Sequence, residues 1–218
     1  MGEHHHEAHV HGHSHDRGWS GVVRYLSLLP YMWTSEVSTA VVGLAAPRAG
    51  ERVVDLGSGM GPATVVAAET GASVVAVDPT PFLRRILGAR RLAQRARRRI
   101  SVVEGAAEAI PVADASVDAL WSVNTMHHWT ELDRALREIH RVLRRGGRLV
   151  LVDEDMDDPA HPFHERFARR RAGRARHFEV IDPVDVAARL RRLGFASADG
   201  SLAPVAGRPA RLVRGVKG

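Results

Sequence analysis

From residue 51 onward, short apolar runs alternate with segments of helical periodicity, and this alternation limits the possible folds more than any other feature. Each run is apolar almost throughout, which is typical of strands buried on both faces of a parallel sheet. Five such runs are RVVDLG (52–57), SVVAVD (73–78), ISVVEG (100–105), VDALWSV (117–123) and RLVLVD (148–153). The alternation therefore predicts an α/β protein in which helices cover both faces of a parallel sheet.

The segments between the runs carry helix signals. Residues 62–70 begin with a proline and are followed by a glycine, as helices often are. Residues 81–99 place apolar side chains at helical spacing. Thr130 and Asp133 have the spacing of a capping box, which predicts the start of another helix. That helix is expected to end before a turn formed by RRGGR (144–148).

The order of elements changes after residue 154. A polar stretch that contains Arg and His spans 154–179, and a helix is predicted at about 182–193. Two further segments, near 196–205 and 209–216, predict an antiparallel hairpin at the edge of the sheet.

Composition excludes several classes of protein. The 218 residues include no Cys, which excludes disulfides, Cys-ligated metals and Cys nucleophiles. No apolar run approaches the ~20 residues that span a bilayer. Residues 1–18 are polar where a signal peptide would be apolar, so a cytoplasmic protein is expected. The net charge is +6, and Lys217 is the single Lys among 31 basic residues; we interpret the Arg excess as codon bias rather than as phosphate binding.

A glycine-rich turn follows the first apolar run, in VVDLGSGMGP (53–62). Its glycines are Gly57, Gly59 and Gly61. Ligands of open parallel sheets bind where the strands end, and glycine lets the backbone approach a ligand closely. The spacing fits neither the dinucleotide motif, since the third glycine comes one residue early, nor the P-loop, since no Lys follows.

Two acidic residues suggest which ligand the turn binds. Asp55 precedes the first glycine by two positions, and a carboxylate there would repel a pyrophosphate. It would suit a positively charged ligand such as S-adenosylmethionine, which has an ammonium, a sulfonium and no phosphate. Asp78 ends the second run, at the position from which a carboxylate can accept hydrogen bonds from ribose hydroxyls.

These segments together resemble the class I S-adenosylmethionine-dependent methyltransferases. The resemblance runs from about residue 51 to 155. Within the family, this segment is most similar to the small-molecule type that includes the quinone-biosynthesis methyltransferases. The motifs that carry it are VVDLGSGMGP, VVAVDPT, VEGAAEAIPVADASVDALWSVNTMHHW and RVLRRGGRLVLVDED.

The resemblance implies a fold and a set of cofactor-binding residues. The fold is a Rossmann-like, seven-stranded, mostly parallel sheet with helices on both faces and an antiparallel C-terminal hairpin, over residues 51–218. The implied cofactor is S-adenosylmethionine, and the matching positions are Asp55, Gly57, Ser58, Gly59, Asp78, Pro79, Ala106, Ala107 and Asn124. The chain departs from the family at Ala106, where Asp is common, and at Arg145, where Pro is common.

The methyl acceptor is expected to be a small organic molecule, methylated by direct displacement. His127 or His128 is the candidate general base, because an imidazole exchanges protons near neutral pH. The alternative for this pair is one His packed in the core and the other at a helix cap. The acceptor wall could include aromatic and Met side chains of the N-terminal part, although plain packing is favoured for them; these are Trp19, Tyr25, Tyr31, Met32 and Trp33.

Two other functions stay open. RNA methylation is less favoured, because the run NTMH (124–127) lacks the Pro-Pro-aromatic motif of base-amine methyltransferases and the chain has no Cys nucleophile. The acidic run DEDMDD (153–158) with His161 and His164 could bind a divalent ion, but a solvated loop is favoured.

A His-rich segment opens the chain and provides the third possible function. Residues 1–18 are expected to be a disordered tail, and 19–50 to form helices that cover the cofactor site. The tail could chelate Zn, Ni or Cu, which would make metal binding a separate role. Its candidate ligands are His4, His5, His6, His9, His11, His13 and His15. The oligomeric state is not readable from the sequence.

Overall fold

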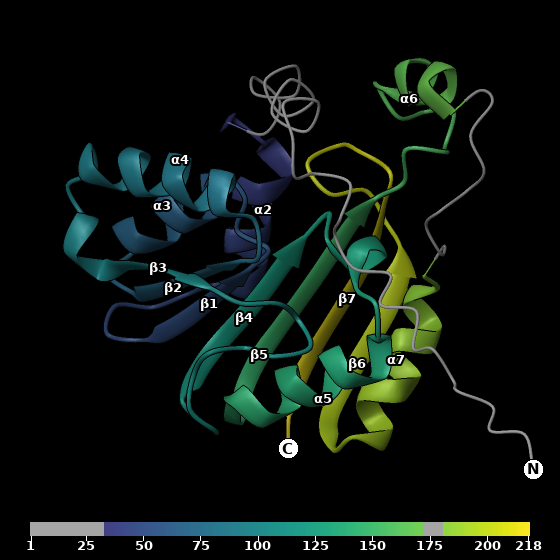
Figure 1. Cartoon of the computed structure of the whole chain (residues 1–218). Coiled ribbons are helices and arrows are strands. Elements are labelled where there is room, and N and C mark those ends of the chain that lie inside the picture. Colours follow the sequence, from purple (N-terminus) through teal and green to yellow (C-terminus); the bar gives the residue numbers. More distant parts are fainter. Residues whose placement is uncertain (1–32, 172–180) are drawn as a thin grey trace, which may run out of the picture.

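The structure is a computed structural model that describes residues 33–171 and 181–218. Within these residues, seven strands form one sheet in the order β3-β2-β1-β4-β5-β7-β6 (Figure 1). The five strands from β3 to β5 are parallel, and β7 is antiparallel to both β5 and β6. The expected Rossmann-like fold and its C-terminal hairpin are confirmed.

The strands follow the apolar runs closely. They are β1 (Arg52–Leu56), β2 (Ser73–Asp78), β3 (Ile100–Glu104), β4 (Val117–Val123), β5 (Leu143–Glu154), β6 (Phe195–Leu202) and β7 (Ala210–Lys217). In β1 and β2 every residue after the first is buried. Burial on both faces explains why these runs are apolar throughout, as a parallel sheet under two helical layers requires.

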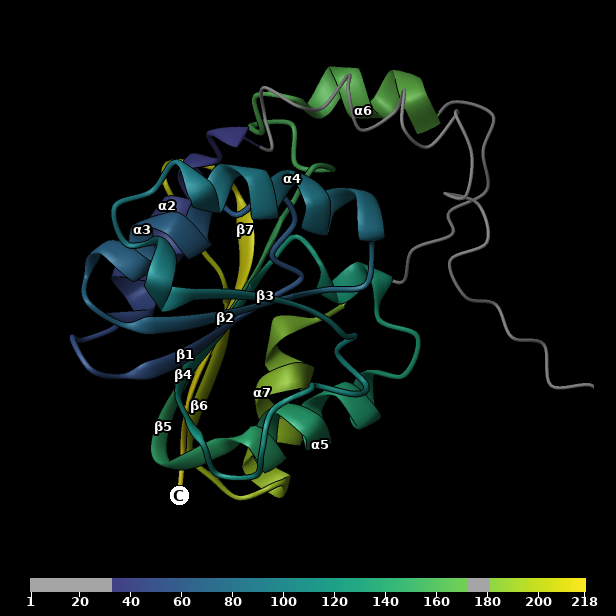
Figure 2. The ribbon, with the colours of Figure 1, turned by 60° about the vertical axis from the view of Figure 1, so that its left-hand side comes forward.

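Helices cover both faces of the sheet, and each layer has its own core (Figure 2). The helical segments are α2 (Glu36–Ala45), α3 (Pro62–Glu69), α4 (Pro81–Leu92), η2 (Arg97–Arg99), η3 (Met126–His128), α5 (Leu132–Val142), α6 (His164–Arg171) and α7 (Pro183–Arg192). Val41 of α2 and Ala67 of α3 belong to one apolar cluster, whereas Ile139 of α5 and Leu190 of α7 belong to the other. The strand ends between these layers are the place for a ligand site.

The helix expected over 81–99 is shorter than predicted. α4 ends at Leu92, and a turn and the short helix η2 lead into β3. The side chain of Leu92 is 66% exposed, so the apolar stripe of the helix does not continue to the end of the segment. The chain has to reverse there because Ile100 pairs with Val74 at the start of β3.

The capping box expected at Thr130 and Asp133 is wrong. α5 begins at Leu132 with Glu131 at its N-cap, and no side chain caps it. The Thr130 hydroxyl instead donates to a Glu108 carboxylate oxygen at 3.1 Å, and Asp133 forms an ion pair with Arg189 of α7 at 2.7 Å. Both side chains therefore bind residues that are distant in the sequence, and neither caps the helix.

The turn expected over 144–148 is also wrong, because the segment belongs to β5. Val117 pairs with Leu143 and Ala119 with Arg148, so β5 carries extra residues as a bulge opposite β4. Gly146 has a φ of 71°, and a side chain on Gly147 would collide with the Arg144 carbonyl. The two glycines therefore shape a bulge, where they had been expected to form a turn.

The N-terminal expectations fall largely outside the described residues. The His-rich tail and its seven candidate ligands lie there, as do Trp19, Tyr25, Tyr31 and Met32. Of residues 19–50, the described part contains α2, which packs on α3, β4 and β5. The role of that segment as a cover of the cofactor site stays a prediction. Among the described residues no helix is both long and apolar enough to cross a membrane.

Candidate functional site

The candidate site lies at the carboxyl ends of β1 and β4, where the sheet order changes direction. β1 contacts β2 on one side and β4 on the other. The helices that follow these two strands, α3 and α5, pack in different apolar clusters, the arrangement in which ligands of open parallel sheets bind in a crevice between the strand ends. The glycine turn follows β1, and η3 follows β4, so both lie at this point (Figure 1).

The glycine turn has a backbone that other residues adopt only with strain. Gly57, Gly59 and Gly61 have φ angles of 72°, 53° and 77°. The N–H groups of Gly57 and Ser58 donate to the Val77 carbonyl at 2.8 and 3.0 Å, which fastens the turn to the end of β2. A side chain on Gly57 would collide with the methyl group of Thr125. The turn therefore approaches the segment after β4 closely.

Asp55 lies beneath the turn with only 3% of its surface exposed. Its carboxylate accepts a hydrogen bond of 2.5 Å from the hydroxyl of Thr64, in the first turns of α3. Burial raises the pKa of Asp55 to about 6, and the side chains of Thr64 and Trp121 partly offset that rise. The group is thus mostly ionised at neutral pH and places a negative charge under the turn.

Asp78 holds the turn from the neighbouring strand. One carboxylate oxygen accepts from the Gly59 N–H at 2.8 Å, and the other accepts from the Thr80 N–H at 2.8 Å. Burial raises the pKa of Asp78, and these two backbone hydrogen bonds act against the rise. Asp78 therefore shapes the glycine turn, a role that the sequence did not suggest beside the expected ribose contact.

Ser58 is the polar residue of the turn whose side chain has no partner. Its hydroxyl is buried and makes no hydrogen bond within the described part of the chain. A buried hydroxyl without a partner usually indicates a missing ligand or water. With two buried carboxylates and a glycine-rich turn beside it, this set of polar groups fits a cationic nucleoside such as S-adenosylmethionine.

Three further positions that the resemblance implies follow the ends of β2 and β3, with Pro79 expected beside the ribose and Ala106 and Ala107 along the adenine edge. Pro79 follows β2 directly, and Ala106 and Ala107 follow β3. Ala107 is buried in the core, whereas Ala106 forms a small bridge with Ala109. The methyl group of Ala106 supplies no side-chain hydrogen bond, so any polar contact to a ligand here would come from the backbone.

Asn124 follows β4 directly and has a φ of 56°, in the left-handed region. Its amide nitrogen donates to a Glu154 carboxylate oxygen at 2.8 Å, and its amide oxygen accepts from the Glu154 N–H at 2.7 Å. Its side chain is thus joined to the end of β5, and its expected place in the cofactor site stays a prediction.

His127 is bound to the neighbouring strand end. Its Nδ1 lies 2.9 Å from a carboxylate oxygen of Asp153, the residue before Glu154. The side chain of His127 is 31% exposed, while Asp153 is buried. The His128 ring stacks against His127 at 4.1 Å between ring centres, tilted by 47°. His127 is thus held by a carboxylate and accessible, as a proton acceptor has to be.

Glu154 is the centre of a buried polar cluster. Its carboxylate lies 2.9 Å from Nε2 of His161 and 3.2 Å from Arg208, which precedes β7. The side chains of Glu154 and His161 are fully buried. Arg208 also reaches Glu36 of α2 at 3.3 Å. The cluster joins four segments that are far apart in the sequence.

The comparisons with known proteins agree with this geometry. Residues 54–151 match the family described as Methyltransferase domain. Residues 54–151 of this chain are thus similar to class I S-adenosylmethionine-dependent methyltransferase domains. The matched range contains the glycine turn, both buried acids, Asn124 and His127, and it ends shortly before Asp153.

Relatives of the methyltransferase domain include quinone-biosynthesis proteins. The ubiquinone/menaquinone biosynthesis C-methyltransferase of Rubrivivax gelatinosus is 38% identical over 130 residues, which are 58% of this chain and 49% of that protein. An uncharacterized methyltransferase of Mycobacterium tuberculosis is 44% identical over 112 residues, which are 51% of this chain and 43% of that protein. The chain therefore spans about half the length of the curated relatives it matches.

A solved structure supports the fold. The putative S-adenosyl-L-methionine-dependent methyltransferase of Methanococcus maripaludis superposes with a TM-score of 0.65, and the match covers 93% of this chain and 94% of that one. The two sequences are 18% identical, so the likeness shows the fold alone.

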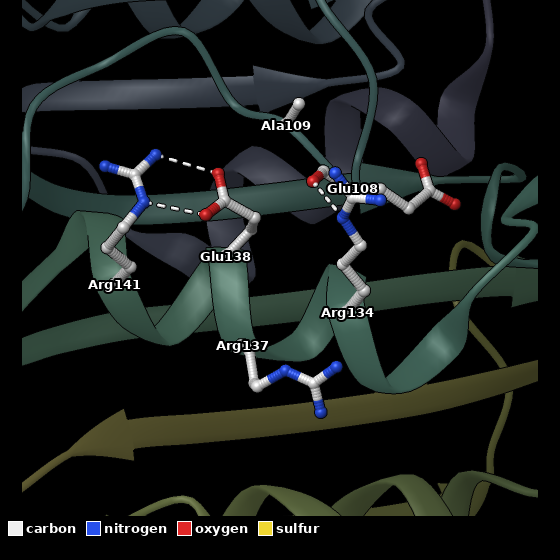
Figure 3. A pocket seen from close by; sticks show the side chains of 6 residues that line it. All are labelled: Glu108, Ala109, Arg134, Arg137, Glu138 and Arg141. Atoms are coloured by element: carbon white, nitrogen blue, oxygen red, sulfur yellow. Dashed lines mark hydrogen bonds and ion pairs between the residues drawn. The ribbon is translucent and has the colours of Figure 1, made fainter.

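A groove on the methyltransferase domain lies away from the glycine turn, between α5 and the loop after β3 (Figure 3). It encloses about 510 Å³, and Arg134, Arg137 and Arg141 line it. Arg141 forms a two-pronged ion pair with Glu138, and Arg134 donates to the Glu108 carbonyl. Because these two cations are already bound to protein oxygens, the groove is not a strong candidate for an anion site.

The hypothesis that the acidic run after β5 binds a divalent ion gains no support in the described part of the chain. Those residues contain no group of three or more His, Cys, Asp or Glu that could hold an ion. His161 is bound to Glu154, and Asp155 is bound to Arg211 at 2.7 Å. Two acidic side chains of this run are thus already paired with other residues of the protein.

Sequence reasoning missed three residues that shape the site. Thr64 carries a helix-start signal nearby but no signal of its contact with Asp55. Arg208 lies in a turn far from the motifs, and Asp153 was placed in the acceptor region and in an acidic run but not paired with His127. Each acts through a partner at least nine residues away, so no local pattern could have identified it.

Proposed function

We propose that this protein transfers a methyl group from S-adenosylmethionine to a small organic acceptor by direct displacement. The observation that carries the proposal is the glycine turn that Asp78 holds through the Gly59 N–H, with the buried Asp55 carboxylate in the strand before it and the Ser58 hydroxyl, which has no partner in the described part of the chain, on it. Bound S-adenosylmethionine supplies a methyl carbon on a sulfonium, which a nucleophile attacks in line.

The charge of the turn favours this ligand over a dinucleotide. Two buried carboxylates next to a pyrophosphate would repel it, whereas they attract a sulfonium and an ammonium. Gly57, Ser58 and Gly59 would hold the methionine part, Asp78 and Pro79 the ribose, and Ala106 and Ala107 the adenine edge. Asn124 would lie beside the methionine part, with its side chain held by Glu154.

The relatives support a small acceptor of the quinone type. The protein of Rubrivivax gelatinosus and a demethylmenaquinone methyltransferase of Thermobifida fusca both carry such substrates in their names. We prefer His127 to His128 as the general base, because the Asp153 carboxylate lies 2.9 Å from Nδ1 of His127 and holds its ring. Alignment of the acceptor and removal of its proton are then the tasks of the domain.

The test is calorimetric titration of S-adenosylmethionine and S-adenosylhomocysteine into the full chain. Wild type is expected to bind both, and Asp78→Ala is expected to bind neither well, because it releases Gly59 and removes the ribose contact. Asp157→Ala is the matched control, because it removes a carboxylate from an exposed residue of the loop after β5.

Three results would contradict the proposal. The first is a folded wild type that binds neither ligand, and the second is an Asp78→Ala variant that binds as tightly as the control. The third concerns the acceptor. Methyl transfer from labelled S-adenosylmethionine to RNA, with none to quinols or phenols, would replace the small acceptor with a nucleic acid.

A further inference from the structure

The carboxylate of Asp153 joins the end of β5 to the segment that follows β4. It is buried at the end of β5, and one carboxylate oxygen accepts from the N–H groups of Thr125 and Met126 at 3.0 and 3.3 Å. The other oxygen accepts from the His127 N–H at 3.1 Å and lies 2.9 Å from Nδ1 of the same residue. Asp153 thus binds the first turn of η3 and the ring that projects from it.

These contacts fix the position of the ring proton. The carboxylate oxygen beside Nδ1 accepts hydrogen bonds, so Nδ1 has to carry the proton in the neutral imidazole. The lone pair then resides on Nε2, and Nε2 is the proton acceptor of the ring. A carboxylate that orients an imidazole in this way also stabilises the imidazolium formed when Nε2 takes up a proton.

η3 lies directly against the glycine turn. Thr125, which precedes η3, packs so closely on Gly57 that a side chain there would collide with it. The Ser122 hydroxyl donates to the Leu56 carbonyl at 2.8 Å, which joins the ends of β4 and β1. His127 is therefore two residues from the contact with the turn, and its backbone is fixed by Asp153.

We propose that Asp153 is the positioning residue of His127, and that the pair selects a methyl acceptor that has to lose a proton, namely one with an O–H or N–H nucleophile. This inference rests on the proposed function for its chemistry. The acceptor proton goes to Nε2 of His127 while the oxygen or nitrogen forms a bond to the methyl carbon. The carbon–sulfur bond breaks, and its electron pair stays on sulfur.

The first test measures the ring proton directly. Nitrogen-15 NMR of the full chain, with the His127 signal assigned by its loss in His127→Gln, distinguishes the protonated nitrogen from the bare one. The neutral ring of wild type is expected to carry the proton on Nδ1. A proton on Nε2 would overturn the proposal without any variant of Asp153.

The variant Asp153→Asn tests the cause. Its amide oxygen can face the Thr125 and Met126 N–H groups, which leaves the amide NH₂ group facing Nδ1 and the single backbone N–H of His127. The opposite orientation would leave two N–H groups facing an NH₂ group, so it is disfavoured. The His127 proton is therefore expected to move from Nδ1 to Nε2 in the variant. An unchanged proton position would contradict the positioning role.

Asp155→Asn is the matched control, because it makes the same chemical change two residues later and its carboxylate binds Arg211. Its His127 signals are expected to match those of wild type. Titration of S-adenosylhomocysteine separates the two proposals. A wild type that does not bind this ligand contradicts the proposed function. The position of the His127 ring proton tests the Asp153–His127 pair independently of ligand binding. With a phenol or quinol acceptor, Asp153→Asn is expected to lose about 10²-fold to 10⁴-fold in turnover, and an amine without protons is expected to be no substrate.

Discussion

The glycine turn after β1 and the polar cluster at the end of β5 meet the same crevice but are built in opposite ways. The turn consists of glycines in left-handed conformations beside a buried carboxylate whose pKa is raised, and its Ser58 hydroxyl has no partner in the described part of the chain. The cluster around Glu154 pairs its buried groups with side chains from distant segments, so it is satisfied. The difference teaches that the turn is shaped for a ligand, while the cluster holds the architecture around it.

The largest expected effect tests whether the cluster stabilises the fold. Glu154→Leu leaves Arg208, His161 and Asn124 without their common acceptor in a buried place. Removal of one partner from such a network costs about 3–5 kcal/mol of unfolding free energy. Urea denaturation followed by circular dichroism measures it. Glu36→Gln is the control, since it removes the exposed partner of Arg208 and is expected to cost less than about 1 kcal/mol. Equal losses in both variants would refute the comparison.

The next effect concerns the requirement for glycine in the turn. Gly57→Ala adds a methyl group at a φ of 72° and against Thr125, which is expected to cost about 2–4 kcal/mol. Gly50→Ala is a matched control, because Gly50 has a φ of 85° but open space around it. That variant is expected to cost about 1 kcal/mol, the backbone part alone. Thermal melts of both variants give the difference, which should vanish if close approach to Thr125 is unimportant.

A smaller effect, of opposite sign, sharpens the contrast. The pKa of Asp55 is raised from 3.8 to about 6, so between these values the folded chain keeps a proton that the unfolded chain has released. Stability therefore falls as pH rises through this window, by up to about 3 kcal/mol, and changes no further through Asp55 above it.

Asp55→Asn tests this account, because it removes the charge and leaves an oxygen for Thr64. The variant is expected to match wild type near pH 4 and to exceed it in stability at pH 7, while it binds S-adenosylmethionine more weakly. Urea melts at the two pH values measure the gain. A variant that is less stable than wild type at pH 7 would show that the carboxylate is not strained.

The smallest expected effect on stability comes from the His-rich tail. Deletion of residues 1–17 is expected to abolish binding of Zn²⁺ or Ni²⁺ and to leave the melting temperature and S-adenosylhomocysteine affinity unchanged. Calorimetric titration of the ion into both chains measures this. Metal affinity that survives the deletion would place a site in the remaining chain.

The fold could be predicted from the sequence to a large extent, and the site only in part. The apolar runs gave the strands because burial on both faces leaves no room for polar residues. The glycine turn, Asp55 and Asp78 were predicted because they are contiguous with those strands. Predictions failed where a side chain had a tertiary competitor, as Thr130 has in Glu108 and Asp133 has in Arg189.

The sequence by itself determined the alternation of strands and helices, the glycine turn and the methyltransferase resemblance, because each depends on residues close together in the chain. The tertiary structure alone decided that Asp153 binds His127 and that Glu154 gathers Asn124, His161 and Arg208. These partners meet because parallel strands end at one edge of the sheet and the hairpin returns to it. No local pattern records that meeting, since the hydrogen bonds join residues up to 54 positions apart.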